Sequence, residues 1–482
     1  MKHSIICLLV GLAFASFASA ERPPNIIYIL VDDLGYGDLS LTGQQHFETP
    51  NIDRLAAEGM QMTQHYSGAP VCAPSRCALL TGKHTGNAVV RGNAEVLPEG
   101  QEAMPADTYT LAHLLQEAGY ATGVFGKWGL GAPGSTSEPH DMGFERFYGY
   151  NCQRLAHHYY PYFIWDDQER VILWDNFGLE EKIYAPTLIH EQTLEFIEAN
   201  KGKPFFCYYA VIQPHAEMFA PEDYMEIYRG KFLPESAYEG VDSGLNYRRG
   251  PYGSQPESHA AFAAMVHTID DYVGDIVAKL KELGIDKNTL IIFTSDNGPH
   301  FEGGHNPAFF DSAGGLRGLK RDLYEGGIRV PTIARWPGSV PAGSVSEHLS
   351  AFWDVMPTVA ELAGVNAPDD IDGISFAPTL RGEPGQQVHD YLYWEFHELQ
   401  GRQAIRQGKW KGVRYGVAIE PNKPIELYDL SVDPGEQNNV AADNPEVVAK
   451  LSDLLAKART VSPLHDFNFP KKRRKAKLAA YE

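Results

Sequence analysis

Four nearly continuous apolar runs of strand length stand out along the chain, and each ends in polar side chains. The runs cover residues 25–31, 120–126, 205–212 and 290–295. Uninterrupted runs of this kind are typical of parallel strands that are buried on both faces. Beyond their ends lie Asp32-Asp33, Lys127, His215 and Asp296-Asn297. Since open α/β sheets bind ligands beyond the carboxyl ends of their strands, we expect these side chains to gather at one edge of a sheet.

Segments with helical periodicity separate these runs and predict a layered α/β protein. They cover residues 50–59, 110–119, 192–199, 259–283 and 352–363, so strand and helix alternate from residue 23 to about 370. After residue 372 the pattern changes to short strands and turns, at 391–396, 402–407 and 409–414. Two stretches without clear periodicity, 134–177 and 230–256, are expected to be functional loops, the first as a wall of a substrate pocket and the second over its entrance.

Two of the strand ends offer oxygen ligands. Asp32 and Asp33 are adjacent, and Asp296 is followed by Asn297. Adjacent carboxylates repel one another, so at a strand end they either splay into solvent or share a cation. Carboxylate and carboxamide oxygens suit Ca²⁺ or Mg²⁺. Asp and Asn are also ordinary turn residues, so a single end of this type would mean little.

The pentapeptide Cys72-Ala73-Pro74-Ser75-Arg76 predicts a helix that begins at a reactive position. Pro74 fits the first turn of a helix and Gly82 fits its far end. Residue 72 then lies at the helix N-terminus, where free N–H groups favour an anion, and Arg76 follows one turn later on the same face. The structural alternative is a buried cysteine, which is the commonest role of free Cys.

Together these motifs resemble the type I, formylglycine-dependent sulfatases of the alkaline-phosphatase-like superfamily. The resemblance covers essentially the whole chain after residue 20 and includes the stretches 318–331 and 426–439. It implies a three-layer α/β/α sandwich with a smaller C-terminal antiparallel-sheet subdomain, closed by a helix at 445–459. We therefore expect a catalytic domain at 21–370, a C-terminal subdomain at 371–466 and a basic flexible tail at 467–482.

The resemblance also implies a role for each site residue. Cys72 would be oxidised to formylglycine by a maturation enzyme, and its hydrated aldehyde would attack sulfur. Arg76 and Lys127 would hold the sulfate and the hydrated aldehyde, and His215 and Lys320 would face the leaving oxygen. The divalent ion, Ca²⁺ with Mg²⁺ as the alternative, would be held by Asp32, Asp33, Asp296, Asn297 and an oxygen of residue 72.

The chain departs from the family pattern at one position. The family has a histidine two residues after its first lysine, whereas this chain has Lys127-Trp128-Gly129. That histidine is the base that lets the sulfated intermediate collapse, so another residue acts, water relays the proton, or the site is impaired. The nearby histidines either take over this task or bind substrate; the candidates are His157, His158, His300 and His305.

The termini and the charge restrict where the protein works. Residues 1–20 read as a secretory signal that is cleaved after Ala20, which predicts a secreted or periplasmic protein. No later segment is apolar and long enough for membrane insertion. A net charge of −21 argues against nucleic-acid binding, and the basic run at 471–475 reads as a solvated tail. If Cys72 is converted, at most one disulfide can form among the other cysteines, with Cys152–Cys207 as a candidate.

The sequence therefore predicts a secreted hydrolase of sulfate monoesters whose partner is a sulfated small molecule or glycan. The aromatic and histidine-rich loop at 148–165 and the polar run at 83–93 favour a carbohydrate sulfate, because aromatic faces stack on sugar rings. The alternatives are an aryl-sulfate hydrolase, a phosphonate or phosphodiester hydrolase of the same superfamily, and a non-catalytic sulfated-glycan binder.

Overall fold

Strand β1 (Asn25–Val31) lies inside a ten-stranded sheet, and its side chains alternate between two hydrophobic cores. Ile27, Ile29 and Val31 belong to one core. Ile26, Tyr28 and Leu30 belong to the other. Successive side chains of a strand point to opposite faces, so a run that is apolar at every position must be covered on both sides. The apolar run of the sequence is therefore explained by helices on both faces.

The structure is a computed structural model that describes residues 22–462, 464 and 467–469. The predicted secretory signal and the basic run at 471–475 lie outside the described residues. Among the residues described, no helix combines the length and the apolar character needed to cross a membrane.

The large sheet has a parallel centre, and the four predicted strands are neighbours in it. Strands β9, β1, β8, β4 and β5 run parallel, and β10 pairs antiparallel with β9. The carboxyl ends of β9, β1, β8 and β4 therefore share one edge. In sheet order the strands are β11 (Ser344–Ser346), β2 (Met60–Met62), β10 (Thr332–Arg335), β9 (Thr289–Ser295), β1, β8 (Phe205–Ala210), β4 (Ala121–Lys127), β5 (Arg146–Tyr150), β6 (Phe163–Asp166) and β7 (Glu169–Ile172).

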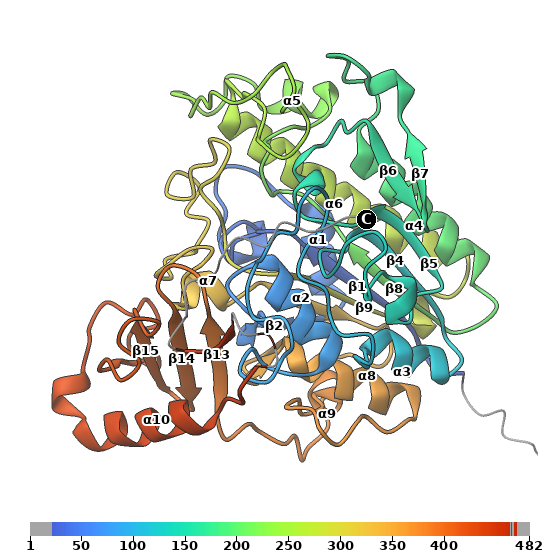
Figure 1. Ribbon diagram of the computed structural model, residues 1–482. Coiled ribbons are helices and arrows are strands. Elements are labelled where there is room, and N and C mark those ends of the chain that lie inside the picture. The colour runs from blue at the N-terminus through green and yellow to red at the C-terminus, as the bar shows by residue number, and fades with distance from the viewer. Residues whose placement is uncertain (1–21, 463, 465–466, 470–482) are drawn as a thin grey trace, which may run out of the picture.

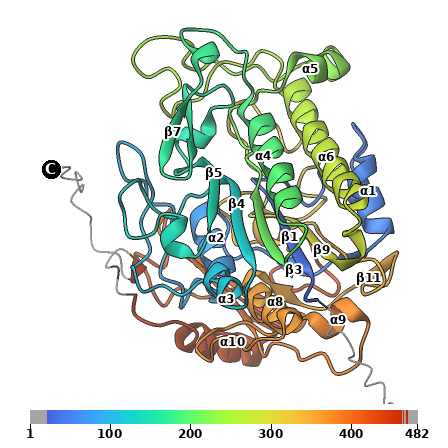
Figure 2. The ribbon, with the colours of Figure 1, turned by 90° about the vertical axis from the view of Figure 1, so that its right-hand side faces the viewer.

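Helices cover both faces of this sheet (Figures 1 and 2). One core is shared with α1 (Pro50–Ala57), α4 (Ala185–Ala199), α5 (Glu222–Tyr228) and α6 (Ser258–Glu282). The opposite core is shared with α2 (Cys72–Thr81), α3 (Leu111–Glu117), α8 (Val355–Ala363) and α9 (Ala377–Arg381). The molecule is thus the three-layer α/β/α sandwich of the alkaline-phosphatase-like fold, as predicted.

The smaller C-terminal sheet is also confirmed, and in Figure 1 it lies to one side of the large sheet. Its four strands are antiparallel. Helix α10 (Pro445–Lys457) packs Leu451 and Leu455 against this sheet, in a hydrophobic core separate from those of the large sheet. Its strands are β13 (Leu392–Phe396), β14 (Arg402–Gln407), β15 (Trp410–Tyr415) and β16 (Glu426–Asp429). Two short strands, β3 (His65–Tyr66) and β12 (Ser350–Ala351), form a separate parallel pair.

Three sequence predictions need correction. Residues 134–177 are not an irregular loop throughout, because β5, β6 and β7 extend the large sheet. These strands are short and β7 is mostly exposed, so their apolar pattern in the sequence is weak. Helix α4 begins seven residues before the predicted start at 192, with Pro186 in its first turn. The candidate disulfide Cys152–Cys207 is not formed, since both cysteines are buried and free.

Candidate active site

The ends of β1 and β9 bring four oxygen-bearing side chains together. Val31 is the register partner of Ser295, so the residues that follow each strand are neighbours. The Asp33 N–H donates to Asp296 Oδ1 at 3.2 Å, and Asn297 Nδ2 donates to Asp33 Oδ1 at 2.7 Å. Asp32 lies in the same cluster, and all four side chains are buried. The sequence prediction that these residues gather is confirmed.

This cluster suits a hard divalent cation. Asn297 Oδ1 is buried and accepts no hydrogen bond from any described residue, so it is an oxygen without a partner. Burial, together with the charge of Asp32, raises the pKa of Asp296 to about 7, although Arg76 opposes the shift. Crowded carboxylates of this kind are stabilised by a cation, and oxygen donors select Ca²⁺ or Mg²⁺ over softer metals.

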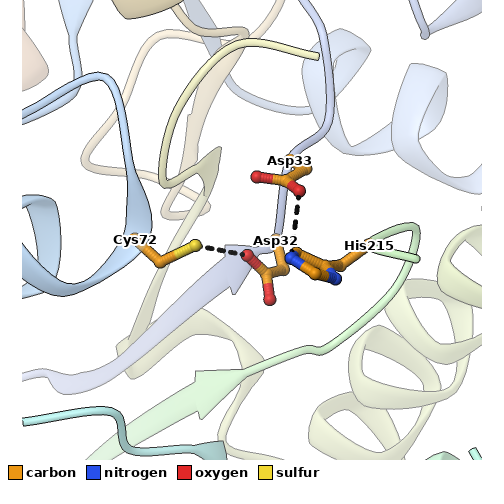
Figure 3. A group of neighbouring side chains, drawn as sticks. All are labelled: Asp32, Asp33, Cys72 and His215. Carbon is orange, nitrogen blue, oxygen red and sulfur yellow. Dashed lines mark hydrogen bonds and ion pairs between the residues drawn. The ribbon is translucent and has the colours of Figure 1, made fainter. Parts of the chain in front are cut away.

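Cys72 is the first residue of α2 and points at the same cluster (Figure 3). Its Sγ lies 3.3 Å from Asp32 Oδ1. The helix ends at Gly82, whose φ of +67° gives the left-handed cap that the sequence predicts. Burial and the nearby Asp296 and Asp32 raise the pKa of the Cys72 thiol well above its ordinary value. A thiol held in its protonated form is a poor nucleophile, so an unmodified Cys72 does not suit attack on an ester.

Two positively charged side chains, one from α2 and one from β4, hold the carboxylates in place. Arg76 donates from Nε and Nη2 to Asp296 Oδ2 at 3.1 and 2.8 Å, and from Nη1 to the Lys127 carbonyl at 2.7 Å. Lys127 Nζ donates to Asp32 Oδ2. Arg76 is fully buried, so in this arrangement its guanidinium orients Asp296 and the end of β4. A carboxylate that is oriented in this way is fixed for ligand binding.

Lys320 and His215 form a second group on the other side of Asp33. Lys320 Nζ lies 2.8 Å from Asp33 Oδ2, 3.0 Å from His215 Nε2 and 3.0 Å from Glu302 Oε2. His215 Nδ1 bonds the Ala216 carbonyl, which places the proton on Nδ1 and leaves Nε2 to accept from Lys320. Burial and the charge of Lys320 lower the pKa of His215 to about 4, so the imidazole is neutral at pH 7.

A cavity of about 300 Å³ opens onto Lys320 and His215. Its walls are mostly polar and come from distant parts of the chain, including one residue of the C-terminal subdomain. Besides Lys320 and His215 the lining residues are Asn93, Glu95, Gln101, Gln153, Arg154, His157, Gly250, Tyr252, Glu302, Arg321 and Glu398. Most of these residues carry no local sequence signal, because they lie in loops whose position depends on packing between distant segments.

Comparison with known families agrees with this geometry. The family model described as Sulfatase matches residues 24–365, which is well over half of the chain. The chain belongs to the sulfatase family. A second model, described as N-sulphoglucosamine sulphohydrolase, C-terminal, matches residues 318–461 and so covers the smaller sheet.

Relatives of known name are sulfatases of several kinds. The chain is 36% identical to mouse N-acetylgalactosamine-6-sulfatase over 392 residues, covering 75% of this chain and 67% of that protein. It is 33% identical to human arylsulfatase A over 492 residues, covering 92% and 89%. Among solved structures, Ps i-CgsB in complex with k-i-k-neocarrahexaose is 26% identical with a TM-score of 0.73, covering 93% and 94% of the two chains. This sulfatase is therefore a sulfuric ester hydrolase.

The four histidines that were candidates to replace the family's base occupy different environments. His300 is fully buried, and both its ring nitrogens bond backbone groups, of Pro214 at 3.1 Å and of Glu302 at 3.0 Å. His158 is likewise engaged by Gly250 N–H at 2.7 Å and Glu217 at 3.2 Å. His305 stacks on Phe262, with ring centroids 3.9 Å apart. Of these four, His157 is the one that lines the cavity, where it stacks on His215 with centroids 5.1 Å apart.

Proposed function

We propose that this sulfatase hydrolyses sulfate monoesters of carbohydrates, with residue 72 acting as formylglycine and with a divalent cation. The observation that carries the proposal is the placement of Cys72 at the start of α2, with its Sγ 3.3 Å from Asp32 in the carboxylate cluster. Residue 72 is thereby directed at the place where both a cation and an anionic group would be bound.

The cation, with Ca²⁺ preferred and Mg²⁺ as the alternative, would be held by Asp32, Asp33, Asp296 and Asn297 with an oxygen of residue 72. When bound, it would neutralise sulfate charge and lower the pKa of a hydroxyl at position 72. Formylglycine, once hydrated, supplies an oxygen nucleophile that the protonated thiol of Cys72 does not. Arg76 would hold Asp296 in position. Lys127 would turn an N–H group of its ammonium from Asp32 to a sulfate oxygen.

Lys320 and His215 would act on the leaving oxygen, because they are the catalytic side chains that line the cavity. Burial lowers the pKa of the Lys320 ammonium, but Asp33 and Glu302 outweigh it and raise this pKa well above its ordinary value, so the group stays protonated. It can therefore donate a proton or a hydrogen bond to the departing alkoxide, while Nε2 of the neutral His215 accepts a hydrogen bond from Lys320 and holds the ammonium in position.

The lining of the cavity favours a sugar over a flat aryl group. Tyr252 contributes an aromatic ring to the wall, while Asn93, Arg154 and Glu302 offer hydrogen-bonding groups for hydroxyls. Two of the names point the same way, since one relative is an N-acetylgalactosamine-6-sulfatase and one structure holds k-i-k-neocarrahexaose, whereas the name arylsulfatase A matches the aryl-sulfate alternative. A secretory signal at 1–20 would bring the protein to such substrates outside the cytoplasm.

The test is direct detection of released sulfate from a panel of sulfated mono- and oligosaccharides. The protein should be coexpressed with a formylglycine-generating enzyme, and 4-nitrophenyl sulfate and a phenyl phosphonate ester should be assayed in parallel. We expect at least one sugar sulfate to be the substrate with the highest kcat/KM. Preference for the aryl sulfate or the phosphonate would replace the proposal by the corresponding alternative. Binding of sulfated glycan without release of sulfate from any ester would identify a non-catalytic binder.

A further inference from the structure

The space beside Gly129, where the family's histidine would stand, is filled by the side chain of Gln153. Beyond β4 the chain stays paired with the segment that follows β5, because Gly129 N–H donates to the Asn151 carbonyl at 3.1 Å. Gln153 lies two residues further along this segment. A Cβ atom on Gly129 would lie 3.3 Å from Gln153 Cγ and 3.4 Å from Nε2. A larger side chain at position 129 would therefore displace Gln153.

The Gln153 carboxamide is enclosed yet has an unused donor. The residue is 6% exposed, and Nε2 is buried without a hydrogen-bond partner among the described residues. Gln153 also lines the cavity together with Lys320 and His215. A buried N–H donor without an acceptor is costly. Nε2 packs against Gly129, and a half-turn of the terminal carboxamide torsion, which is close to two-fold, presents this donor to the cavity and so to a ligand that brings the acceptor.

We propose that Gln153 is a substrate-binding residue whose Nε2 donates a hydrogen bond to an oxygen of the bound sulfate group. This inference rests on the proposed function. Sulfate oxygens accept hydrogen bonds and do not donate them. They therefore match the Gln153 Nε2–H group, a donor without an acceptor in the protein. A carboxamide neither gains nor loses a proton near neutral pH. Gln153 therefore replaces the missing histidine as a group that binds a sulfate oxygen, and proton transfer is left to another residue or to water.

The test compares two substitutions that keep the size of the side chain. Gln153→Met removes the donor, and Gln153→Glu replaces it by a negative charge that repels sulfate. Gln168→Ala, at an exposed turn between β6 and β7, serves as the control. The affinity of the Ca²⁺-loaded proteins for inorganic sulfate is measured by calorimetry, and also as competitive inhibition of ester turnover. Thermal midpoints are recorded for each variant.

We expect sulfate to bind Gln153→Met roughly tenfold or more weakly than wild type, which is the usual effect of losing a hydrogen bond to a charged group. Gln153→Glu should bind more weakly still, and Gln168→Ala should match wild type. Unchanged sulfate affinity in Gln153→Met would overturn the inference, as would failure of both Gln153 variants to fold, since the amide would then be structural. If wild type binds sulfate through Gln153 yet hydrolyses no sulfate ester, the proposed function fails and this inference stands.

Discussion

At the level of single residues, the four candidate histidines differ in how free they are to take over the task of the histidine missing at Gly129. Both ring nitrogens of His300 and of His158 make hydrogen bonds to neighbouring groups, and the ring of His305 packs against aromatic rings. His157 bonds the Gly250 carbonyl through Nδ1 at 2.8 Å, and its Nε2 makes no hydrogen bond to any described residue. His157 is therefore the best-placed proton acceptor of the four.

We predict that His157→Ala slows steady turnover of an aryl sulfate while the burst of the first turnover survives, because the base is needed after the ester bond is broken. His300→Ala should instead lower the thermal midpoint, because it removes a buried ring that bridges two backbone segments. Rapid-quench measurement of the burst separates the two effects. Steady turnover at the wild-type rate in His157→Ala would show that water carries the proton.

The role of Lys320 on the leaving oxygen predicts a dependence on the leaving group. Lys320→Met should reduce kcat/KM for a sugar sulfate by roughly 10²- to 10⁴-fold, the usual contribution of a general acid. The loss should be much smaller for 4-nitrophenyl sulfate, because nitrophenolate leaves without a proton. Lys182→Met, an exposed lysine, is the control. Equal losses for both esters would mean that Lys320 binds sulfate or orders Asp33 and does not act on the leaving group.

At the scale of elements, the site depends on two strand ends being held side by side. Asp296→Ala removes a carboxylate from the end of β9 and leaves the buried Arg76 without its main partner. We expect this variant to lose both metal and activity. In wild type, chelation should abolish activity and Ca²⁺ should restore it better than Zn²⁺, as monitored by sulfate release and metal analysis. Restoration by Zn²⁺ alone would contradict an all-oxygen site.

Strong local patterns account for what could be predicted from sequence. The apolar runs identify β1, β4, β8 and β9 and hence the shared edge, and Pro74 and Gly82 bracket α2 closely. Gln153 and Glu302 could not be found in this way, because they reach the site through loops whose course is set by packing between distant segments. Strands β5 to β7 were missed for a related reason, since short strands at the border of a sheet carry little periodicity.

At the scale of the whole molecule, a buried charge network joins the C-terminal subdomain to the catalytic domain. Lys411 of β15 pairs with Glu325 at 2.9 Å and with Glu436 at 3.0 Å, and all three side chains are fully buried. Tyr66 also donates to Glu325, at 2.5 Å. Glu325 follows Lys320 by five residues and Tyr66 precedes Cys72 by six, so the subdomain holds two segments that carry the site.

One lysine shared by two carboxylates makes stability depend on pH. Burial and the charge of Glu325 raise the pKa of Glu436 to about 7, although Lys411 opposes the shift. The folded protein therefore binds this proton more tightly than the unfolded chain, whose glutamate titrates near its ordinary value. The stabilisation from Glu436 is fully present at pH 4 and is lost as the pH rises through 7, with a slope of up to about 1.4 kcal/mol per pH unit.

We predict that Glu436→Gln removes this component, so wild type should lose stability relative to the variant between pH 5 and pH 7. Thermal midpoints of both proteins, measured across that range at constant Ca²⁺, provide the comparison. Parallel profiles would show that Glu436 stays ionised in the folded protein.

Mass spectrometry of the tryptic peptide covering residues 55–76 decides whether residue 72 works as formylglycine. In a preparation that releases sulfate from an ester, we predict that this peptide carries an aldehyde at position 72, with sulfur replaced by oxygen and two hydrogens lost. Activity should rise in proportion to the aldehyde-bearing fraction across preparations, and Cys72→Ala should be inactive. A fully active preparation in which residue 72 is entirely unmodified cysteine would show that catalysis does not depend on formylglycine.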